Sequence, residues 1–165
     1  MSKQELNQLG IVFRPETSED QKFLRVLYGS TREAEMAMVP WTKEQIEEFL
    51  DMQFEAQSKF YAEQFKGAEF SIVAQGGRSI GRLYLDRRAN EIRIIDIALL
   101  PHFRGRGIGV AILKHVMEIA ANDHLPVTIH VEKNNPAMSL YKKLGYKLIE
   151  DQGVYDLMQW QQVAN

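Results

Sequence analysis

The sequence contains no cysteine at all. Disulfide bonds, thiolate metal sites and a cysteine nucleophile are therefore excluded. The four histidines do not replace the missing ligands, because no two of them have a metal-binding spacing such as H-x-x-x-H. We therefore expect no bound metal. A G-x-S-x-G sequence is also missing, which excludes the nucleophile elbow of the usual hydrolases.

An excess of positive charge and long apolar runs are missing as well. Twenty basic and 22 acidic side chains give a formal net charge of −2, so the chain lacks the basic footprint of a nucleic-acid-binding protein. No run approaches the roughly 18 apolar residues of a membrane span, and the beginning MSKQELNQLG lacks an apolar signal core. We expect a cytoplasmic protein with neither nucleic acid nor membrane as partner.

Composition and periodicity predict a single mixed α/β domain over residues 1–165. A hydrophobic share of 45% is enough for one sizeable core. The expected order is β-α-α-β-β-β-α-β-α-β-β, with strands at 11–14, 69–74, 79–85, 92–99, 127–131, 146–150 and 154–160. Capping boxes at Ser18 with Gln21 and at Thr42 with Gln45 open the first two helices. An irregular loop is expected over residues 31–40.

The segment Ile92–Gly109 is the most informative part of the chain. A β-branched run leads through a proline into a glycine-rich basic turn and then into a helical pattern. The free N–H groups and the dipole of a helix N-terminus favour a phosphate there. The spacing fits neither a dinucleotide fingerprint nor a Walker A loop, but it matches R-x-x-G-x-G at Arg104, Gly107 and Gly109. A basic glycine-rich connection without a ligand is the alternative.

This turn, after a strand and a proline, resembles the acyl-CoA pyrophosphate loop of the GNAT superfamily of N-acetyltransferases. A second block, NNPAMSLYKKLGY over residues 134–146, resembles the helix that follows the fifth strand in that family, with Asn134, Ala137 and Tyr141 in N-x-x-A-x-x-x-Y order. An N-cap at Asn135 and a helix-ending glycine explain much of the block, but neither the start nor the end of the helix requires a tyrosine at position 141. A half-buried core aromatic is the alternative for that tyrosine.

The resemblance covers about residues 91–160, with an acyl-CoA-binding core at about 91–145. It implies a GNAT-like fold whose central sheet splays between the fourth and fifth strands, with acetyl-CoA as the acyl donor in the gap. The pantetheine arm would pair with the end of the fourth strand. The implied cofactor-binding residues are Ala98, Leu99, Leu100, Arg104, Gly105, Arg106, Gly107, Ile108, Gly109, Asn134, Ala137 and Tyr141.

The resemblance also implies direct acetyl transfer to a primary amine of a small molecule or peptide. Tyr141 would protonate the leaving thiolate, since an ordinary tyrosine pKa near 10 keeps it protonated at neutral pH. The Leu99 N–H would stabilise the oxyanion. Asp96 is the candidate base, and a cross-strand ion pair with Arg93 or Arg82 is its alternative role.

The acceptor site is the least readable part of the sequence. The resemblance assigns it to the loop over residues 31–40, where Glu33 and Glu35 either attract a cationic amine or are simply solvated. His130, on the fifth strand, would be able to reach the cleft. The chain is expected to be a monomer or homodimer. A CoA-binding regulatory module without turnover and a plain α/β interaction domain are the alternative functions, and Tyr141 argues against the regulatory module.

Overall fold

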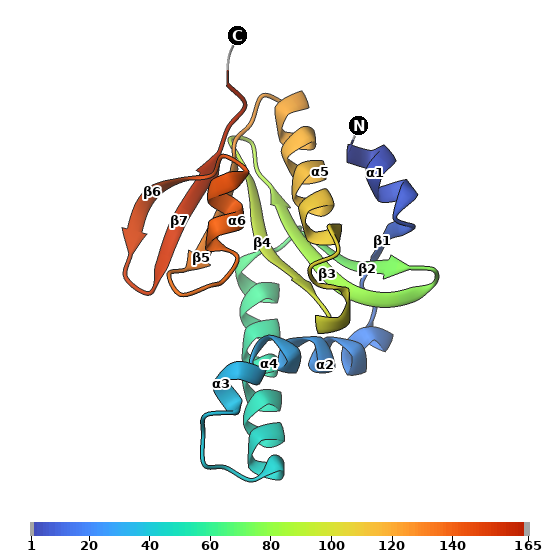
Figure 1. Ribbon diagram of the computed structural model, residues 1–165, viewed down its shortest axis with the longest axis vertical. Helices are drawn as coiled ribbons and strands as arrows, with labels where there is room; N and C mark the ends of the chain where they lie inside the picture. Colours follow the sequence, from blue (N-terminus) through green and yellow to red (C-terminus); the bar gives the residue numbers. More distant parts are fainter. Residues whose placement is uncertain (1, 164–165) are drawn as a thin grey trace.

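The chain folds around a seven-stranded sheet with the order β1-β2-β3-β4-β5-β7-β6 (Figure 1). The computed structural model describes residues 2–163. The strands are β1 (Ile11–Pro15), β2 (Glu69–Gln75), β3 (Arg78–Arg87), β4 (Ile92–Leu99), β5 (Val127–Glu132), β6 (Lys147–Gln152) and β7 (Tyr155–Trp160). The helices are α1 (Ser2–Gln8), α2 (Gln21–Thr31), α3 (Glu33–Met36), α4 (Lys43–Gln64), α5 (Ile108–Asn122) and α6 (Met138–Lys143). The mixed α/β fold and every expected strand are confirmed.

The sheet is splayed between β4 and β5. These strands run parallel but stay paired over only three residues each, ending at Ile94 and Ile129, whereas the other neighbouring strands are antiparallel. Directly after the last paired residue, β4 carries a bulge at Ile95, because Ile94 and Asp96 face successive residues of β3. The implied GNAT-like splay between the fourth and fifth strands is therefore confirmed.

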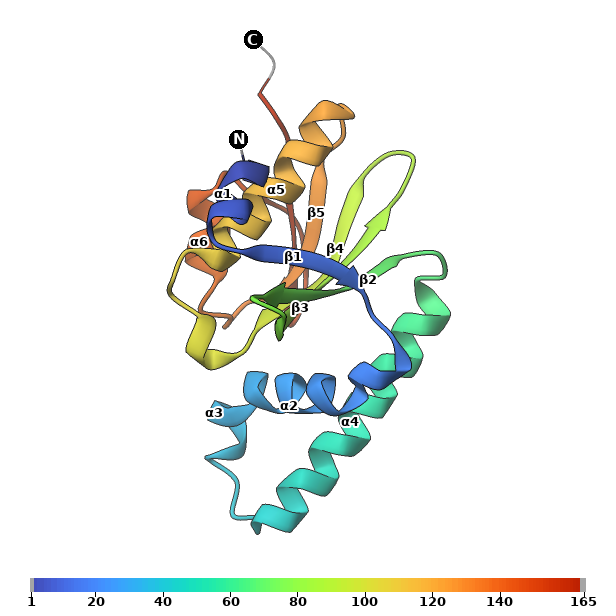
Figure 2. The same cartoon turned by 90° about the vertical axis from the view of Figure 1, so that its right-hand side faces the viewer.

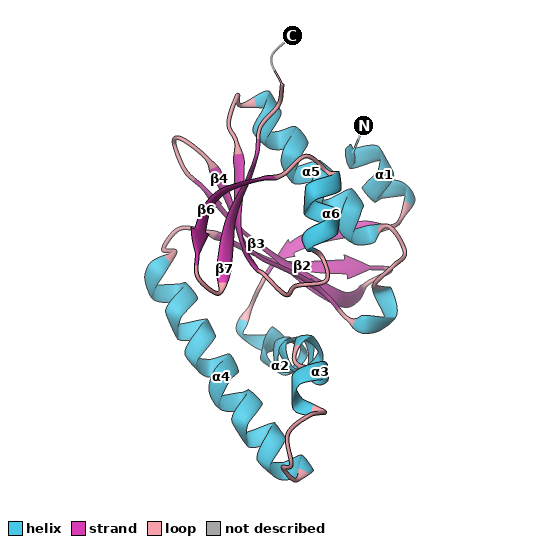
Figure 3. Ribbon diagram, turned by 60° about the vertical axis from the view of Figure 1, so that its left-hand side comes forward, coloured by secondary structure: helices cyan, strands magenta, loops and turns pink. Residues whose placement is uncertain are grey.

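Different helices cover the two faces of the sheet, and each face has its own apolar core. Helices α1, α5 and α6 lie on one face, and α2 and α4 lie on the other (Figures 2 and 3). Side chains alternate along a strand, so Ile72 of β2 packs with Leu24 and Phe54, whereas its neighbour Val73 belongs to the larger core with Ile112 of α5. The sheet separates two cores, and its splay lies between them.

The start of α2 differs from the expectation, because the predicted capping box of Ser18 with Gln21 is wrong. A 3-10 turn precedes the helix, and its capping box is formed by Thr17 and Asp20, one residue earlier. The Asp20 carboxylate accepts the Thr17 N–H at 2.8 Å and also binds the Arg14 guanidinium at 2.7 Å. This second contact gives Asp20 a fixed position that Gln21 lacks.

The remaining helices include one that begins at the expected cap and two that the sequence does not predict. The expected capping box of Thr42 with Gln45 opens α4. The loop at 31–40 contains the one-turn helix α3. Helix α1 is not predicted by the sequence pattern, since Leu6 is its only buried apolar side chain. Among residues 2–163, no helix is both long and apolar enough to cross a membrane.

Helix α6 begins at Met138, three residues after the expected cap at Asn135. The Asn135 side chain still accepts the Ala137 N–H at 2.8 Å, so it caps a turn that leads into the helix. The expected glycine ends α6: Gly145 has φ +101, and the N–H after it returns to the Tyr141 carbonyl at 3.0 Å. This ending fixes the C-terminal turn that carries Tyr141.

Candidate active site

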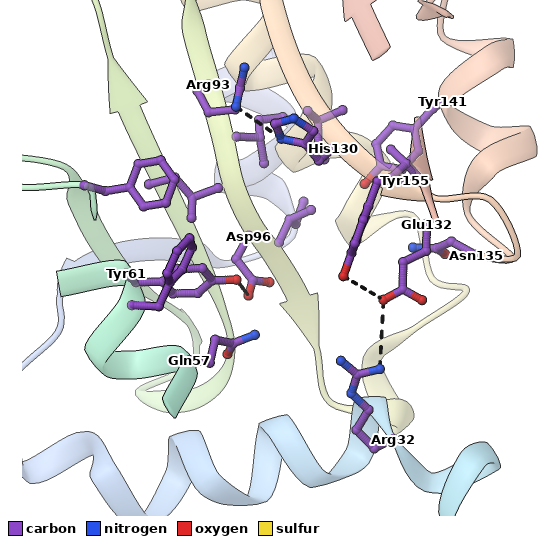
Figure 4. Close-up of a pocket in the computed structure, with 17 residues that line it drawn as sticks. Arg32, Gln57, Tyr61, Arg93, Asp96, His130, Glu132, Asn135, Tyr141 and Tyr155 are labelled. Carbon is purple, nitrogen blue, oxygen red and sulfur yellow. Dashed lines mark hydrogen bonds and ion pairs between the residues drawn. The ribbon is translucent and has the colours of Figure 1, made fainter. Parts of the chain in front are cut away.

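A cavity of about 490 Å³ opens where β4 and β5 separate, on the face covered by α4 (Figure 4). The β4 segment 94–97 forms one wall, α4 a second, and β5 with β7 a third. The residues that line it are Arg32, Gln57, Phe60, Tyr61, Phe65, Arg93, Ile94, Ile95, Asp96, Ile97, Ile129, His130, Val131, Glu132, Asn135, Tyr141 and Tyr155. Asp96 and Tyr141, the two expected catalytic side chains, therefore line one space.

The glycine-rich turn joins the end of β4 to α5. Gly105 and Gly107 have φ values of +71 and +85, a left-handed conformation that glycine adopts most easily. Gly107 is the N-cap of α5, which begins at Ile108. Gly109 lies inside the helix, where an added Cβ would make ordinary contact with Leu99 at 3.9 Å. The turn thus leaves the first N–H groups of α5 without intrahelical partners.

The arginines of the turn have different neighbours. The Arg104 guanidinium donates to the Leu99 carbonyl at 2.9 Å and to the Ser30 hydroxyl at 3.3 Å, so it ties the turn to β4 and α2. Its backbone N–H donates to the Pro101 carbonyl. The exposed Arg106 side chain lies 3.1 Å from a ring nitrogen of His102. Arg106 is thus the more available of the two charges for a phosphate.

The end of β4 turns one set of backbone groups toward the splay. The Leu100 N–H donates to the Ile80 carbonyl of β3 at 2.8 Å. Backbone N–H groups alternate in direction along a strand, so the Leu99 N–H is directed away from β3, on the β5 side. Ala98, Leu99 and Leu100 lie beyond the β4 residues that line the cavity, between those residues and the glycine-rich turn.

Asp96 forms an ion pair with Arg82 and not with Arg93. Its Oδ2 lies 2.6 Å from an Arg82 nitrogen and accepts the Tyr61 hydroxyl at 3.1 Å. The Arg82 side chain is 4% exposed and also donates to the Gln57 amide oxygen at 2.8 Å. Burial raises the pKa of Tyr61, so that hydroxyl remains a donor.

Tyr141 reaches the cavity from α6 as a buried aromatic side chain. Its ring packs edge-on against Tyr146 with centroids 5.5 Å apart. Burial, reinforced by the negative charge of Asp96, raises the pKa of Tyr141 to about 12. Asn135 lines the cavity, whereas its neighbour Asn134 does not, and Ala137 packs against the core.

Several cavity residues are not found by sequence reasoning. Phe60 and Tyr61 belong to the apolar stripe of α4, whose spacing is that of a core-facing helix, and Phe65 is the C-cap residue that follows the helix. The signal for Gln57 is its place in that stripe, and the structure explains it by the hydrogen bond from Arg82. Nothing in the sequence marks Tyr155 of β7 as a cavity residue.

The loop carboxylates do not line the cavity. Glu35 pairs with Arg32 at 3.0 Å, and Glu33 is exposed. Arg32 itself lines the cavity and lies 3.9 Å from Glu132 of β5. The amine-attracting role considered for Glu33 and Glu35 therefore has no support from their positions.

His130 reaches the cavity, as considered from the sequence. Its Nδ1 lies 3.2 Å from the Arg93 guanidinium, so this nitrogen accepts. Burial, together with the Arg93 charge, lowers the pKa of His130. Within residues 2–163, no group of three or more His, Cys, Asp or Glu side chains is placed to hold a metal ion.

The sequence matches a family model described as the acetyltransferase (GNAT) family over residues 30–146. Among solved structures, the PaiA N-acetyltransferase of Thermoplasma acidophilum in complex with coenzyme A superposes with a TM-score of 0.69 and 19% identity, over 92% of this chain and 99% of that one.

Curated relatives match over shorter stretches. The mouse Cysteine-rich protein 2-binding protein is 33% identical over 85 residues, 50% of this chain but 11% of that protein. An N-alpha-acetyltransferase of Sulfurisphaera tokodaii is 35% identical over 60 residues, 34% of this chain and 36% of that one. The chain thus matches only about a tenth and about a third of the lengths of these two relatives.

Proposed function

The chain belongs to the acetyltransferase (GNAT) family, and on that premise we propose that it transfers an acetyl group from acetyl-CoA directly to a primary amine of a small molecule or peptide. The observation that carries the proposal is the cavity in the splay, because Asp96 and Tyr141 both line it. A regulatory module that only binds CoA would not need a protonated tyrosine hydroxyl beside the thioester.

Acetyl-CoA binds mainly to backbone groups in this proposal. The pyrophosphate lies against the N–H groups from Gly105 to Gly109, where the positive end of the α5 dipole and the exposed Arg106 favour negative charge. The pantetheine arm runs along Ala98 to Leu100 and replaces the strand partner that β4 loses at the splay. We assign Asn134 and Ala137 to the pantetheine arm, which they would contact from the opposite side of the gap. The thioester then reaches the cavity between Asp96 and Tyr141.

The reaction is a direct acyl transfer. The neutral amine nitrogen attacks the thioester carbonyl carbon and forms the C–N bond, and negative charge develops on the carbonyl oxygen. The Leu99 N–H donates to that oxygen. The C–S bond then breaks, and the Tyr141 hydroxyl donates a hydrogen bond to the negative charge that develops on the sulfur. The proton of the attacking nitrogen passes to Asp96 or to water, and the departing thiolate takes up a proton from solvent, so that CoA leaves as the thiol.

The role of Asp96 follows from how its two oxygens are used. Both observed contacts, from Arg82 and from Tyr61, fall on Oδ2. We assign Oδ1 to the acceptor ammonium, so that Asp96 orients the amine and takes its proton. An ion pair that serves folding alone is the competing role. The two roles predict different pH–rate profiles for an Asp96→Asn variant.

The first test is ligand binding. A ligand that binds only the native state at about 100 times its Kd stabilises it by about 2.7 kcal/mol, so acetyl-CoA should raise the Tm. Gly107→Val places a Cβ where the pyrophosphate lies and should abolish this shift. Gly153→Val is the matched control, since Gly153 has φ +83 against +85 for Gly107 and an added Cβ meets nothing within 4 Å at either site. The control should lose similar stability but keep the shift.

The second test is turnover. Thiol release from acetyl-CoA across a panel of amines should exceed the rate without amine. Binding without amine-dependent thiol release would favour the regulatory module, and no acetyl-CoA shift in the wild-type chain would contradict the proposal at its first step.

A further inference from the structure

We propose that the acceptor is a primary amine on an apolar or aromatic body that carries no second positive charge. The inference rests on the proposed function, because it concerns the acceptor half of the same cavity. It depends on two independent observations, the aromatic wall supplied by α4 and the way the charges of the cavity are paired.

The aromatic wall consists of Phe60, Tyr61 and Phe65. Their ring centroids lie 6.1 to 6.3 Å apart in mutual edge-on or tilted contact. Phe60 is 54% exposed although it belongs to a cavity, and Tyr155 on the opposite side is 42% exposed. Covering apolar surface that is left open in this way removes it from water, which favours binding. The wall therefore favours an apolar body between α4 and β7.

The wall lies beside the reacting centre. The Tyr61 hydroxyl donates to Asp96 at 3.1 Å. The aromatic wall is therefore in direct contact with the carboxylate that receives the amine. The glycine-rich turn leads into α5, and α5 lies on the face of the sheet opposite to α4 (Figure 2). The thioester thus arrives through the splay, and the substituent of the amine extends along the α4 wall.

The charges of the cavity argue against a second cation. Among the described residues that line it, the carboxylates are Asp96 and Glu132. Asp96 is paired with Arg82 at 2.6 Å, and Glu132 lies 3.9 Å from Arg32 and accepts the Tyr155 hydroxyl at 3.4 Å. A second ammonium would lose its hydration without finding an uncommitted counter-ion, and an unpaired charge is costly to bury.

The arginines point the same way. Arg32 and Arg93 both line the cavity, and Arg82 is paired with Asp96, so the described residues that line the cavity carry no surplus of negative charge. Glu33 and Glu35, which would have favoured a polycation, lie outside the lining. A polyamine or a lysine-rich peptide is therefore disfavoured against a monoamine of the same length.

The test compares two probes that differ only in the second charge. The purified full chain with saturating acetyl-CoA is assayed for thiol release with hexylamine and with 1,6-diaminohexane. We expect at least about a tenfold higher kcat/KM for hexylamine, equivalent to about 1.4 kcal/mol. Phenethylamine should be at least as good as hexylamine, because its ring packs on the aromatic wall.

Variants of the exposed wall residue make the test specific. Phe60→Glu adds a carboxylate to the wall and should move the hexylamine-to-diamine ratio at least tenfold toward the diamine. Phe60→Ala should lower kcat/KM for hexylamine and phenethylamine while the KM for acetyl-CoA stays unchanged. Met52→Ala is the control, since Met52 is 60% exposed on the same helix but lies outside this cavity, and it should change neither ratio nor rate.

The outcomes separate the two proposals. Preference for the diamine, or a ratio that Phe60→Glu leaves unchanged, overturns the acceptor inference and leaves the acetyltransferase proposal standing. Absence of thiol release with every amine, in a chain that still binds acetyl-CoA, overturns the proposed function and with it the inference that rests on it.

Discussion

Replacing Tyr141 by phenylalanine removes one hydroxyl group from the candidate active site and keeps the aromatic ring. The Phe ring keeps the edge-on contact with Tyr146 at 5.5 Å, so the fold and acetyl-CoA binding should persist. Only the hydroxyl that we assign to the leaving sulfur is lost. The KM for acetyl-CoA should barely change, because the lost interaction belongs to the transition state.

The size of the effect follows from the pKa of Tyr141, which burial raises to about 12. An ordinary alkyl thiol has a pKa of about 8.5, so complete proton transfer from this tyrosine to a thiolate is uphill by about 5 kcal/mol, at 1.36 kcal/mol per pKa unit. We therefore expect the hydroxyl to act chiefly as a hydrogen-bond donor to the charge developing on sulfur. Hydrogen bonds to charged groups contribute roughly 1.5–3 kcal/mol, so kcat should fall about 10- to 150-fold, which reaches only the lower end of the general-acid range.

The assay is single-turnover thiol release with acetyl-CoA prebound and amine added in excess. Tyr146→Phe is the matched control, because the Tyr146 hydroxyl is buried without a hydrogen-bond partner among residues 2–163 and does not line the cavity. The control should keep its rate and gain slightly in stability. If Tyr141→Phe retains activity within about threefold of the wild type, well short of that range, the tyrosine is a packing residue and the reasoning fails.

Three further predictions test the surrounding framework. Asp96→Asn should lower kcat and remove the acidic limb of the pH–rate profile if Asp96 is the base. Because the Arg82 side chain is 4% exposed, the same substitution should also lower the free energy of unfolding by about 3 kcal/mol in chemical denaturation. Lost stability with an unchanged pH–rate profile would leave only the ion-pair role. Gly81→Ala should destabilise the fold by about 1–3 kcal/mol, since its Cβ would lie 2.3 Å from a β4 carbonyl oxygen, and an unchanged denaturation midpoint would contradict that close approach. Hydrogen bonds from Arg14 lower the pKa of Asp20 from 3.8 to about 2, so the contribution of Asp20 is present above pH 3.8 and is lost as the pH falls through 2; Asp20→Asn should cost about 1–2 kcal/mol at pH 7, allowing for the partly exposed arginine, and almost nothing at pH 2.

The β4–turn–α5 unit is readable from sequence because every signal in it is local. The β-branched run, the proline, and the glycines that adopt positive φ act within a few residues of one another, and β4 is found with its bounds unchanged at Ile92–Leu99. The capping box at Thr42 is readable for the same reason. The one expected at Ser18 fails because the competing cap at Thr17 is reinforced by Arg14, a residue of β1.

The acceptor side depends on contacts between distant residues, and no local pattern reveals them. Asp96 pairs with Arg82 because the bulge at Ile95 places Asp96 opposite Tyr84 of β3, on the face of the sheet where Arg82 lies. Phe60 reads as core because its spacing on α4 is that of a buried stripe, and only the splay leaves it 54% exposed. The register between β3 and β4 decides the first position and the early end of β4–β5 pairing decides the second, and neither follows from local propensity.

The short pairing of β4 with β5 is a weak connection between two halves of the sheet. Three residues on each strand join a four-stranded half to a three-stranded half. The seam between the halves therefore has fewer paired residues than any other pair of neighbouring strands in the sheet. Opening along such a seam requires the least loss of contacts, and slow amide exchange divides along boundaries of this kind. A ligand arm that pairs with β4 would add the missing bonds and join the halves into one cooperative unit. Under the proposed function, the donor substrate would serve as a temporary strand, and its departure after each turnover would return the seam to its looser state.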